Sequence, residues 1–432
     1  MAVLKWLGQP WLALNRLLAT RALERRIGRP AGVTPYHPVP GSMLYVAASS
    51  LPYHVSGYTT RTHEVVRALR SIGPEVHVMT RPGYPWDRRD RLADADGTET
   101  SVGGVPYRHV KSPSNLRPVL QYALQGAQSV VHEATQRRVS VIHAASNHVN
   151  ALPALLAARQ LGIPFQYEMR GLWELTRISR MPHYEHHHGF KQGLELEGLV
   201  ASNADRLFVI SEQLGRFARE RWGIDRNRMF LLPNCVEPER FALLSPEEVE
   251  LDTIGYAGSL VGYEGLDTLI DAVAQLRVRG ARPNVDIIGD GEARGALEEQ
   301  VRRLGLSDCI RFLGRMPPQQ AQATLGRCAL VCIPRKPFKV CEIVPPIKLV
   351  EAMAMGKPVI VPDLPVFRDE MGAHPAGWFF KAGDAADLAR VIETALGDGA
   401  TLKAVGERAK QYAATHRCWR DFVTEALPDS AR

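Results

Sequence analysis

The feature that most constrains this chain is an alternation of short apolar segments with longer amphipathic segments, and the alternation occurs twice. In the first half, the apolar segment 43–49 is followed by a helix-like segment at 62–73 and a second apolar segment at 75–83. After residue 250 the same order restarts with apolar residues 253–260 and a helix-like segment at 266–280. Strands joined by single helices form parallel sheets covered on both faces. The pattern therefore predicts an α/β chain with two Rossmann-like domains.

The predicted domain boundaries follow from where the alternation starts and stops. A chain of 432 residues exceeds the usual size of a single hydrophobic core. Residues 42–235 are predicted to form the first domain and residues 251–405 the second, with the Pro- and Glu-rich stretch 236–250 as the linker. A C-terminal helix within 406–432 is expected to return to the first domain. Residues 1–41 form an N-terminal amphipathic extension, and we expect a cleft between two facing domains.

The composition is that of an ordinary globular enzyme, with 45% apolar and 23% charged residues. The six cysteines are too few for a disulfide scaffold, which favours a reducing, cytoplasmic environment. No run of about 18 apolar residues is present, so no membrane-spanning helix is predicted. The net charge of +7 favours acidic partners. We expect no nucleic acid among them.

The N-terminal extension has a pattern of its own. Its apolar residues recur at roughly helical spacing and are followed by Arg21, Arg25, Arg26 and Arg29. It lacks the uninterrupted apolar core and the cleavage site of a signal peptide. A helix of this kind can lie on an anionic membrane surface, so we expect peripheral contact with the inner face of the cell membrane through residues 1–35. The alternative is that the segment packs on the protein's own body or on a partner.

The stretch CEIVPPIKLVEAMAMGKPVI at residues 341–360 places charged residues at the start of a predicted helix. Pro346 suits the first helical position, and the N–H groups exposed at a helix start attract anions such as phosphate. Lys348 and Glu351 are three residues apart and therefore share a helix face. An amine and a carboxylate placed this way could hold a phosphate and a sugar hydroxyl together. The alternative is a surface helix with an incidental ion pair.

Small residues mark the ends of several predicted strands. Gly258 and Ser259 end the first strand of the second domain, and Gly289 ends the next one. Gly57 occupies the equivalent strand-helix junction of the first domain. Ligands of open α/β sheets bind at these strand ends, where glycine lets the backbone approach a ligand closely. These four residues are therefore candidates for ligand binding, and turns that need glycine for backbone reasons are the alternative.

Charged and aromatic residues also gather at one strand end of the first domain. The segment YEMRGLWE contains Glu168, Arg170, Trp173 and Glu174. Carboxylates and guanidinium groups hold sugar hydroxyls, and an aromatic face covers a sugar ring. The segment therefore predicts a sugar site, with a structural ion pair as the competing interpretation.

Two polar segments contain residue types that can bind metal ions. Asp94 and Asp96 form an Asp-x-Asp pair, but no apolar strand precedes them, so a solvated loop is predicted. Residues 183–188 contain four histidines and Glu185, but adjacent histidines on a loop point in different directions. The favoured interpretation is a loop over the cleft. We therefore predict no metal site.

Several stretches in combination resemble a known family. They are GSLVGYEGLDTLIDA, IIGDGE, IRFLGRMP and PPIKLVEAMAMGKPVI, preceded by LLPNCVEPERF. They resemble the retaining glycosyltransferases of family four, which have the GT-B fold. SGYT, RPGYP and YEMRGLWE are similar to segments of a bacterial exopolysaccharide subgroup. The resemblance covers roughly residues 42–425 and implies that the second domain holds most of the nucleotide sugar.

The resemblance also implies roles for residues of the second domain. Glu351 corresponds to the glutamate that holds the donor ribose, and Glu342 to the glutamate that faces the donor sugar. Lys348 and Arg335 would neutralise the diphosphate, which a metal does in the other major fold class. No cofactor or metal is therefore expected.

Further roles concern the base, the diphosphate and the first domain. Backbone groups at Arg315 and Met316 would meet the base of the nucleotide. Gly57 would let a loop of the first domain approach the diphosphate. Glu168 and Arg170 are candidate catalytic residues by their position at a strand end.

Three positions depart from the family pattern. Glu342 and Glu351 are nine residues apart, whereas the common spacing is eight. Glu264 stands where the family usually has a lysine, which removes one cation and makes Lys348 and Arg335 more necessary. Glu168 stands where many members have a histidine.

The resemblance therefore implies a retaining, metal-independent hexosyltransferase. Its donor would be a nucleotide diphosphate sugar, with UDP favoured, and its acceptor a surface or exopolysaccharide glycan, free or lipid-linked. One alternative is a sugar-nucleotide epimerase of the same fold, which would consume donor without an acceptor. Another is a non-catalytic nucleotide-binding scaffold of a polysaccharide complex, an idea supported by the missing lysine at Glu264.

Overall fold

The computed structural model describes residues 2–28, 35–73, 75–88, 97–237, 240–241, 248–372 and 376–428, with side chains from residue 14 onward. The chain forms two compact α/β units. Unit 1 contains Met1–Ile210, Leu214–Pro233 and Trp419–Arg432, and unit 2 contains Ser211–Gln213 and Asn234–Cys418. The prediction of two parallel-sheet α/β domains is confirmed. Much of the predicted linker, and both Asp94 and Asp96, lie outside the described residues.

Unit 1 is built on an eight-stranded sheet with the order β3-β4-β2-β1-β5-β6-β7-β8. The strands are β1 (Met43–Ala47), β2 (Val76–Thr80), β3 (Glu99–Val102), β4 (Val105–Arg108), β5 (Val141–Ala145), β6 (Phe165–Met169), β7 (Arg206–Val209) and β8 (Met229–Leu231). All neighbours are parallel except β3 and β4, which form an antiparallel hairpin at one edge. Every residue of β1, β5 and β6 is buried, as expected for parallel strands covered on both faces.

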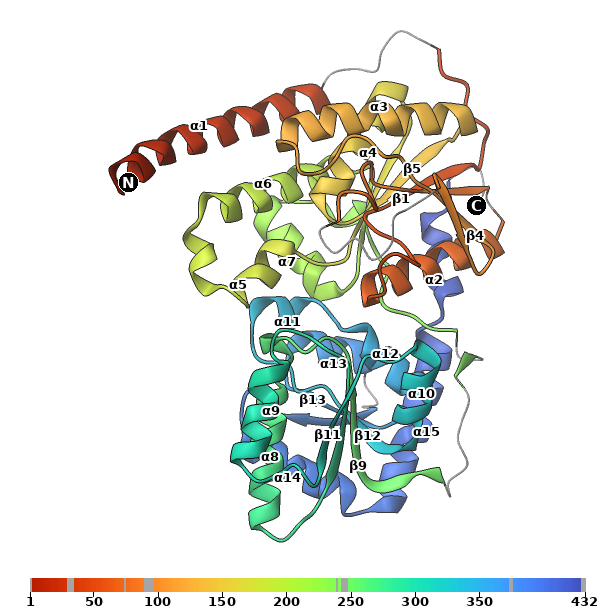
Figure 1. Cartoon of the computed structure of the whole chain (residues 1–432). Helices are drawn as coiled ribbons and strands as arrows, with labels where there is room; N and C mark the ends of the chain where they lie inside the picture. The colour runs from red at the N-terminus through yellow and green to blue at the C-terminus, as the bar shows by residue number, and fades with distance from the viewer. Residues whose placement is uncertain are drawn as a thin grey trace. The chain divides into compact units, whose positions relative to one another are not determined.

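The helices of unit 1 connect these strands and cover both faces of the sheet (Figure 1). They are α1 (Ala2–Ile27), α2 (Gly57–Ser71), α3 (Val119–Arg137), α4 (His148–Leu161), α5 (Trp173–Ile178), η1 (Pro182–His186), α6 (His188–Ser202), α7 (Glu212–Trp222), η2 (Arg226–Arg228), α16 (Trp419–Val423) and η6 (Thr424–Ala426). Ser56 starts α2 with a capping box, because its hydroxyl accepts from the Thr59 N–H while the Thr59 hydroxyl accepts from the Ser56 N–H. This cap fixes the start of the helix beside the end of β1.

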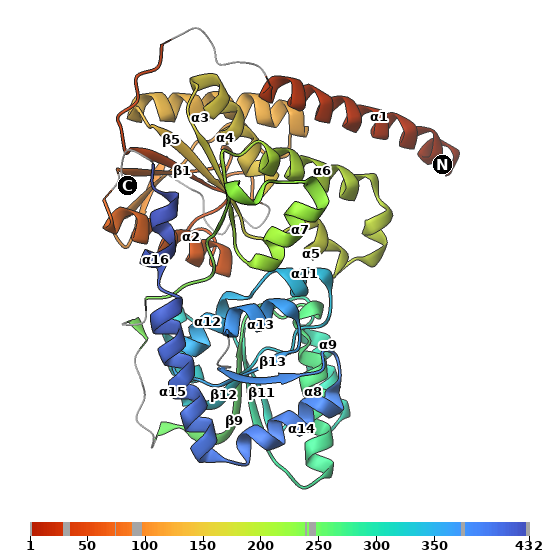
Figure 2. The same cartoon turned by 180° about the vertical axis from the view of Figure 1, so that it is seen from behind.

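Helix α1 packs on unit 1 through only part of its surface. It contacts α3, α4 and α6, where Thr20, Leu23 and Ile27 are buried. Figures 1 and 2 show its N-terminal part continuing past these helices. On its exposed side Leu17 is 44% and Leu18 is 53% exposed. Apolar residues therefore lie on both sides of the second half of α1, one side buried on unit 1 and the other exposed.

Unit 2 contains a fully parallel six-stranded sheet with the order β11-β10-β9-β12-β13-β14. The strands are β9 (Glu250–Ala257), β10 (Asn284–Ile288), β11 (Ile310–Gly314), β12 (Cys328–Cys332), β13 (Val359–Pro362) and β14 (Gly377–Phe380). The connecting elements are η5 (Gly262–Glu264), α8 (Leu266–Val278), α9 (Arg294–Arg303), α10 (Pro318–Arg327), α11 (Lys339–Ile343), α12 (Ile347–Ala354), α13 (Pro365–Met371), α14 (Ala385–Leu396) and α15 (Gly399–His416).

One part of the core of unit 2 lies between this sheet and helices α8, α9 and α14 (Figure 2). It includes Ile254, Tyr256, Leu269, Val273, Ile287, Leu297, Leu388 and Ile392. The apolar positions of α8 and α14 recur at helical spacing toward the sheet, and Asp384 caps the start of α14 by accepting from the N–H groups of Ala386 and Asp387.

The C-terminal helix differs from its predicted course. Helix α15 belongs to unit 2, and only the residues from Trp419 onward, beginning with the short helix α16, belong to unit 1. The helix is interrupted at Arg417 and Cys418, because Cys418 pairs with Val236 as a short bridge and the Arg417 carbonyl accepts from the Val236 N–H. The chain therefore returns to unit 1 after α15 has ended, and α16 packs on α2.

Candidate active site

Three charged side chains meet at the carboxyl ends of β9 and β12 in unit 2. The Glu264 carboxylate accepts from Arg335 Nη2 at 2.9 Å and Nε at 3.2 Å, and from Lys348 Nζ at 2.7 Å. Arg335 lies on the loop after β12, Lys348 in the first turn of α12, and Glu264 at the end of η5. We refer to Glu264, Arg335 and Lys348 as the charge cluster. The two cations predicted to neutralise a diphosphate thus share one carboxylate.

Tyr256 and a backbone carbonyl also contact the charge cluster. The Tyr256 hydroxyl lies 2.8 Å from Lys348 Nζ and 3.2 Å from a Glu264 oxygen, and Lys348 Nζ lies 4.2 Å from the Tyr256 ring centroid. Arg335 Nη1 donates to the Val344 carbonyl at 2.9 Å. Residues on β9, η5, the loop after β12 and α12 are therefore held together by one network.

Close backbone packing positions the two turns that carry the network. A Cβ on Gly265 would lie 2.0 Å from the Pro334 carbonyl oxygen, and Gly265 has a φ of +73°, so only glycine fits this position. A Cβ on Gly289 would lie 1.8 Å from the Gly258 carbonyl oxygen. These contacts hold the turn after β9 against the ends of β10 and β12. A Cβ on Gly258 would also lie 2.5 Å from Lys348 Nζ, which places the ammonium group at that turn.

The charges of the cluster alter one another's ionisation. Burial alone would raise the pKa of Glu264, but Arg335 and Lys348 hold it at about 2. Burial lowers the pKa of Lys348, and Glu264 opposes that effect. The pKa of Arg335 is raised because attraction to Glu264 outweighs the effect of burial. Two cations and one carboxylate leave the cluster with a net charge of +1.

The two predicted donor-site glutamates lie on different helices. Glu351 is in α12, half-buried, and its charge acts on Lys348. Glu342 is in α11, where its carboxylate accepts from Lys339 Nζ at 3.0 Å. The structure therefore brings Glu351 close to Lys348 and pairs Glu342 with a lysine of its own helix. The extended residues between α11 and α12 accommodate the nine-residue spacing.

The remaining predicted donor-site residues of unit 2 lie at strand ends. Ser259 is exposed beside Gly258, and Gly289 follows β10. Arg315 and Met316 follow β11, where the Arg315 side chain is 80% exposed and lies 3.7 Å from Asp290. These residues follow the ends of neighbouring parallel strands and therefore share the carboxyl edge of the sheet with the charge cluster.

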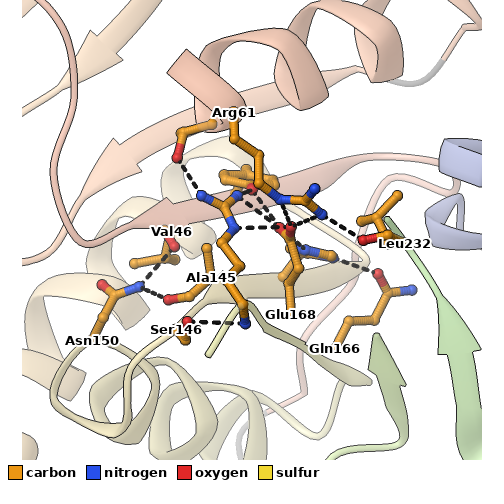
Figure 3. Close-up of polar contacts among 12 residues, drawn as sticks. Val46, Arg61, Ala145, Ser146, Asn150, Gln166, Glu168 and Leu232 are labelled. Atoms are coloured by element: carbon orange, nitrogen blue, oxygen red, sulfur yellow. Dashed lines mark hydrogen bonds and ion pairs between the residues drawn. The ribbon is translucent and has the colours of Figure 1, made fainter. Parts of the chain in front are cut away.

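In unit 1, Glu168 lies inside a buried ion network rather than on an open surface (Figure 3). Its side chain is 0% exposed and accepts from Arg61 at 2.8 and 3.0 Å and from Arg170 at 2.8 and 2.9 Å. The hydroxyl of Tyr45 donates to it at 2.7 Å, and His143 Nε2 lies 3.5 Å away. The two arginines hold the pKa of Glu168 well below its usual range despite burial.

Arg61 and Arg170 are both buried in this network. Arg61 donates to the Leu232 and Pro233 carbonyls and stacks on the Trp419 ring at 5.1 Å. Arg170 donates to the Thr62 hydroxyl at 2.7 Å. The network joins the sheet, α2, the residue after β8 and α16. The geometry thus favours the competing interpretation of Glu168 and Arg170, a structural ion network.

Other predicted residues of unit 1 lie apart from that network. Gly57 is exposed as the first residue of α2. Trp173 is 69% exposed, whereas Glu174 next to it is buried. The four histidines of 183–188 are exposed on η1 and the start of α6. Over the described parts of the chain, no group of three or more His, Cys, Asp or Glu side chains is arranged to hold a metal ion.

Sequence reasoning missed the importance of Glu264, Tyr256 and Arg61. In the sequence, Glu264 stands out only because the family usually has a lysine there. An acid beside a glycine turn, in a domain with two candidate phosphate-binding cations, is the one signal that points to an ion pair. Tyr256 is embedded in an apolar strand, and Arg61 in a helix, so nothing in the local pattern distinguishes them.

None of the helices in the described ranges combines the length and apolar content needed to cross a bilayer.

Comparison with known proteins places both units in one functional group. A family model described as "Glycosyl transferase 4-like domain" matches residues 56–235, and one described as "Glycosyl transferases group 1" matches residues 238–412. The chain is 24% identical over 361 residues to a 2-deoxystreptamine glucosyltransferase of Streptomyces kanamyceticus, covering 78% of this chain and 89% of that one.

Two solved structures share the fold. Sucrose-phosphate synthase from Thermosynechococcus elongatus superposes with a TM-score of 0.73 at 16% identity, covering 89% of this chain and 97% of the other. Anabaena Alr3699/HepE in complex with UDP-glucose superposes with a TM-score of 0.67 at 18% identity, covering 89% and 98%.

Proposed function

The chain belongs to the glycosyltransferases with the GT-B fold, and we propose that it is a retaining, metal-independent enzyme that transfers a sugar from a nucleotide diphosphate sugar to a glycan. The observation that carries this proposal is the charge cluster. Arg335 and Lys348 lie at the carboxyl ends of the unit 2 strands, where open α/β sheets bind ligands. Their charge is suited to a diphosphate without a metal ion.

The proposed chemistry is electrostatic. As the bond between the sugar and the diphosphate breaks, negative charge develops on the leaving group. Arg335 and Lys348 stabilise that charge, because donors fixed in advance in a partly buried site act without reorganising. Glu351 holds the ribose hydroxyls, and Glu342 faces the donor sugar. In a retaining reaction the departing diphosphate helps to remove the acceptor proton on the same face of the sugar.

The donor and acceptor are proposed on separate grounds. A UDP-sugar is proposed because a protein of the same fold, Anabaena HepE, was solved in complex with UDP-glucose. A bacterial surface or exopolysaccharide glycan, free or lipid-linked, is proposed as acceptor because SGYT, RPGYP and YEMRGLWE are similar to segments of that subgroup.

We also propose that the protein contacts an anionic membrane through α1. Leu14, Leu17 and Leu18 are exposed on this helix, and Arg21 and Arg25 are exposed further along it. Apolar side chains enter the interface between headgroups and acyl chains, and arginines attract anionic headgroups. This combination supports peripheral binding on the cytoplasmic side.

The test is a thermal-shift panel of nucleotides and nucleotide sugars, followed by turnover with and without EDTA. A ligand at about 100 times its Kd stabilises the native state by about 2.7 kcal/mol, so UDP or a UDP-sugar should raise Tm. Sugar transfer to an oligosaccharide acceptor should continue in EDTA. Donor consumption without acceptor would instead indicate an epimerase, and binding without any turnover would indicate a scaffold.

A further inference from the structure

Glu264 uses both carboxylate oxygens to connect side chains from different elements. Its Oε1 accepts from Arg335 Nε and Nη2, and its Oε2 accepts from Lys348 Nζ and from the Tyr256 hydroxyl. The Glu264 side chain is 5% exposed, and those of Arg335 and Lys348 are 10% and 14% exposed. This one carboxylate is therefore the shared anchor of both cations.

The two cations need this counter-charge to remain together. Like charges in a poorly solvated site repel strongly, and an unpaired buried charge is costly. Glu351 also acts on Lys348, from the same helix. Removing the charge of Glu264 would therefore separate Arg335 from Lys348 or neutralise the lysine.

The contacts leave donors of the cluster available for a ligand. Arg335 has five N–H groups and Lys348 has three. In the contacts of the described residues, Arg335 uses three, toward Glu264 and Val344, and Lys348 uses two, toward Glu264 and Tyr256. Glu264 thus fixes both side chains while leaving N–H groups for an anion.

From this geometry we propose that Glu264 is a positioning residue, which holds the Arg335 and Lys348 donors in the arrangement that receives the leaving diphosphate. The inference rests on the proposed function, because it requires that the two cations receive the diphosphate of a donor. It assigns Glu264 itself no contact with the donor. Its role is to set the distance between the two cations and to keep Lys348 protonated. Glu264, which stands where the family usually has a lysine, then contributes to the site by positioning its two cations.

The proposal has a pH signature. The groups that face Lys348 are Glu264 and Tyr256, Arg335, Cys341 and Glu351. Burial and Arg335 lower the pKa of Lys348, whereas Glu264 and Glu351 raise it. Without the charge of Glu264, the lysine loses its proton at a lower pH. The alkaline limb of the turnover profile should therefore move to lower pH.

The experiment compares Glu264→Gln and Glu264→Asp with the matched control Asp267→Asn. Asp267 pairs with Lys336 at 2.5 Å just after η5, but its side chain is 41% exposed and lies outside the charge cluster. For each full-length variant we would measure kcat and KM for the donor, the Kd of UDP, the pH profile of kcat, and Tm.

Glu264→Gln should lower kcat/KM by about 100-fold, the scale of a 1 Å misplacement. It should also weaken UDP binding and shift the alkaline limb. Glu264→Asp keeps the charge and should recover part of the loss, and Asp267→Asn should match the wild type. A Glu264→Gln protein with a lower Tm but wild-type kcat/KM and pH profile would overturn the proposal.

If Glu264→Gln does not fold, Glu264→Asp decides the question. Its shorter side chain cannot reach both cations equally, so its kcat/KM should fall at a near-normal Tm, and unchanged kinetics would overturn the proposal. If the wild type neither binds UDP nor transfers sugar from any donor, the proposed function fails and the positioning role falls with it. Loss confined to the variants, with an active wild type, supports both.

Discussion

Replacing Glu168 by glutamine should destabilise unit 1 far more than a surface substitution would. The substitution keeps the size of the side chain but removes the negative charge between Arg61 and Arg170, which are both buried. The neutral amide could still accept hydrogen bonds. The two guanidinium groups, however, would lose their counter-charge at a position where the side chain of residue 168 is 0% exposed.

The magnitude follows from the cost of breaking a buried ion pair. Removing one partner usually costs about 3–5 kcal/mol, because the remaining charge stays buried. Two cations remain here, although Arg61 also donates to backbone carbonyls and Arg170 to Thr62. For a domain of about 150–250 residues, 1 kcal/mol corresponds to about 2–4 °C in Tm. The expected fall is therefore roughly 6–20 °C.

The assay is differential scanning calorimetry at pH 7, with Glu174→Gln as the matched control. Glu174 is also a buried glutamate of unit 1, but its Oε2 has no hydrogen-bond partner among the described residues, and burial raises its pKa. Neutralising it should therefore change stability by no more than about 1 kcal/mol. A Glu168→Gln variant as stable as Glu174→Gln would refute the ion-network reasoning and would restore the sugar-site interpretation.

The same two residues should respond oppositely to pH. The pKa of Glu168 is lowered in the folded state, so its contribution is full above the unfolded value of about 4.3 and is lost as pH falls through the lower folded value. The deficit of Glu168→Gln should therefore shrink below about pH 4. The pKa of Glu174 is raised, so wild-type stability should fall as pH rises from about 4.3 through the folded value, and Glu174→Gln should remove that fall.

Three further outcomes are expected. Transfer should persist in EDTA, and a rate that is abolished by EDTA and restored by Mn²⁺ would contradict the role of the two cations. Lys348→Ala should lower kcat by about 10²–10³-fold, whereas Glu351→Ala should mainly raise the KM for the donor, by roughly ten- to over a hundredfold; near-normal kinetics in both would leave α12 without a role. Replacing Leu14, Leu17 and Leu18 by serine should weaken sedimentation with anionic liposomes while leaving transfer to a soluble acceptor intact, and unchanged sedimentation would exclude this face of α1.

Much of the fold could be predicted because parallel strands have a strong local signal. Residues 43–47 and 328–332 are continuous apolar segments, and both are fully buried strands. The interruption between α15 and α16 could not be predicted, because it depends on a bridge from Cys418 to Val236 far along the chain.

The resemblance points to two members of the charge cluster, but the sequence does not reveal the network that joins them. Lys348 and Arg335 were identified by resemblance, and the structure places them together. Glu264 lies 71 residues from Arg335 and 84 from Lys348, so no local spacing reveals that it holds both. The same limit applies to Glu168, whose partner Arg61 is 107 residues earlier. When the partners are this far apart in the chain, the local sequence does not distinguish a carboxylate that binds a sugar from one that forms a buried ion pair.

The return of the chain to unit 1 has a consequence for biosynthesis. Trp419, which is fully buried and stacks on Arg61, is translated only after all of unit 2. At about 5–20 residues per second, it leaves the ribosome roughly 9–37 s after Pro233, the last residue of unit 1 before unit 2. During that interval the nascent unit 1 has its sheet but lacks the helix that covers one of its buried arginines. A chain cut short anywhere before Trp419 therefore carries an incomplete first unit, even when the second is whole.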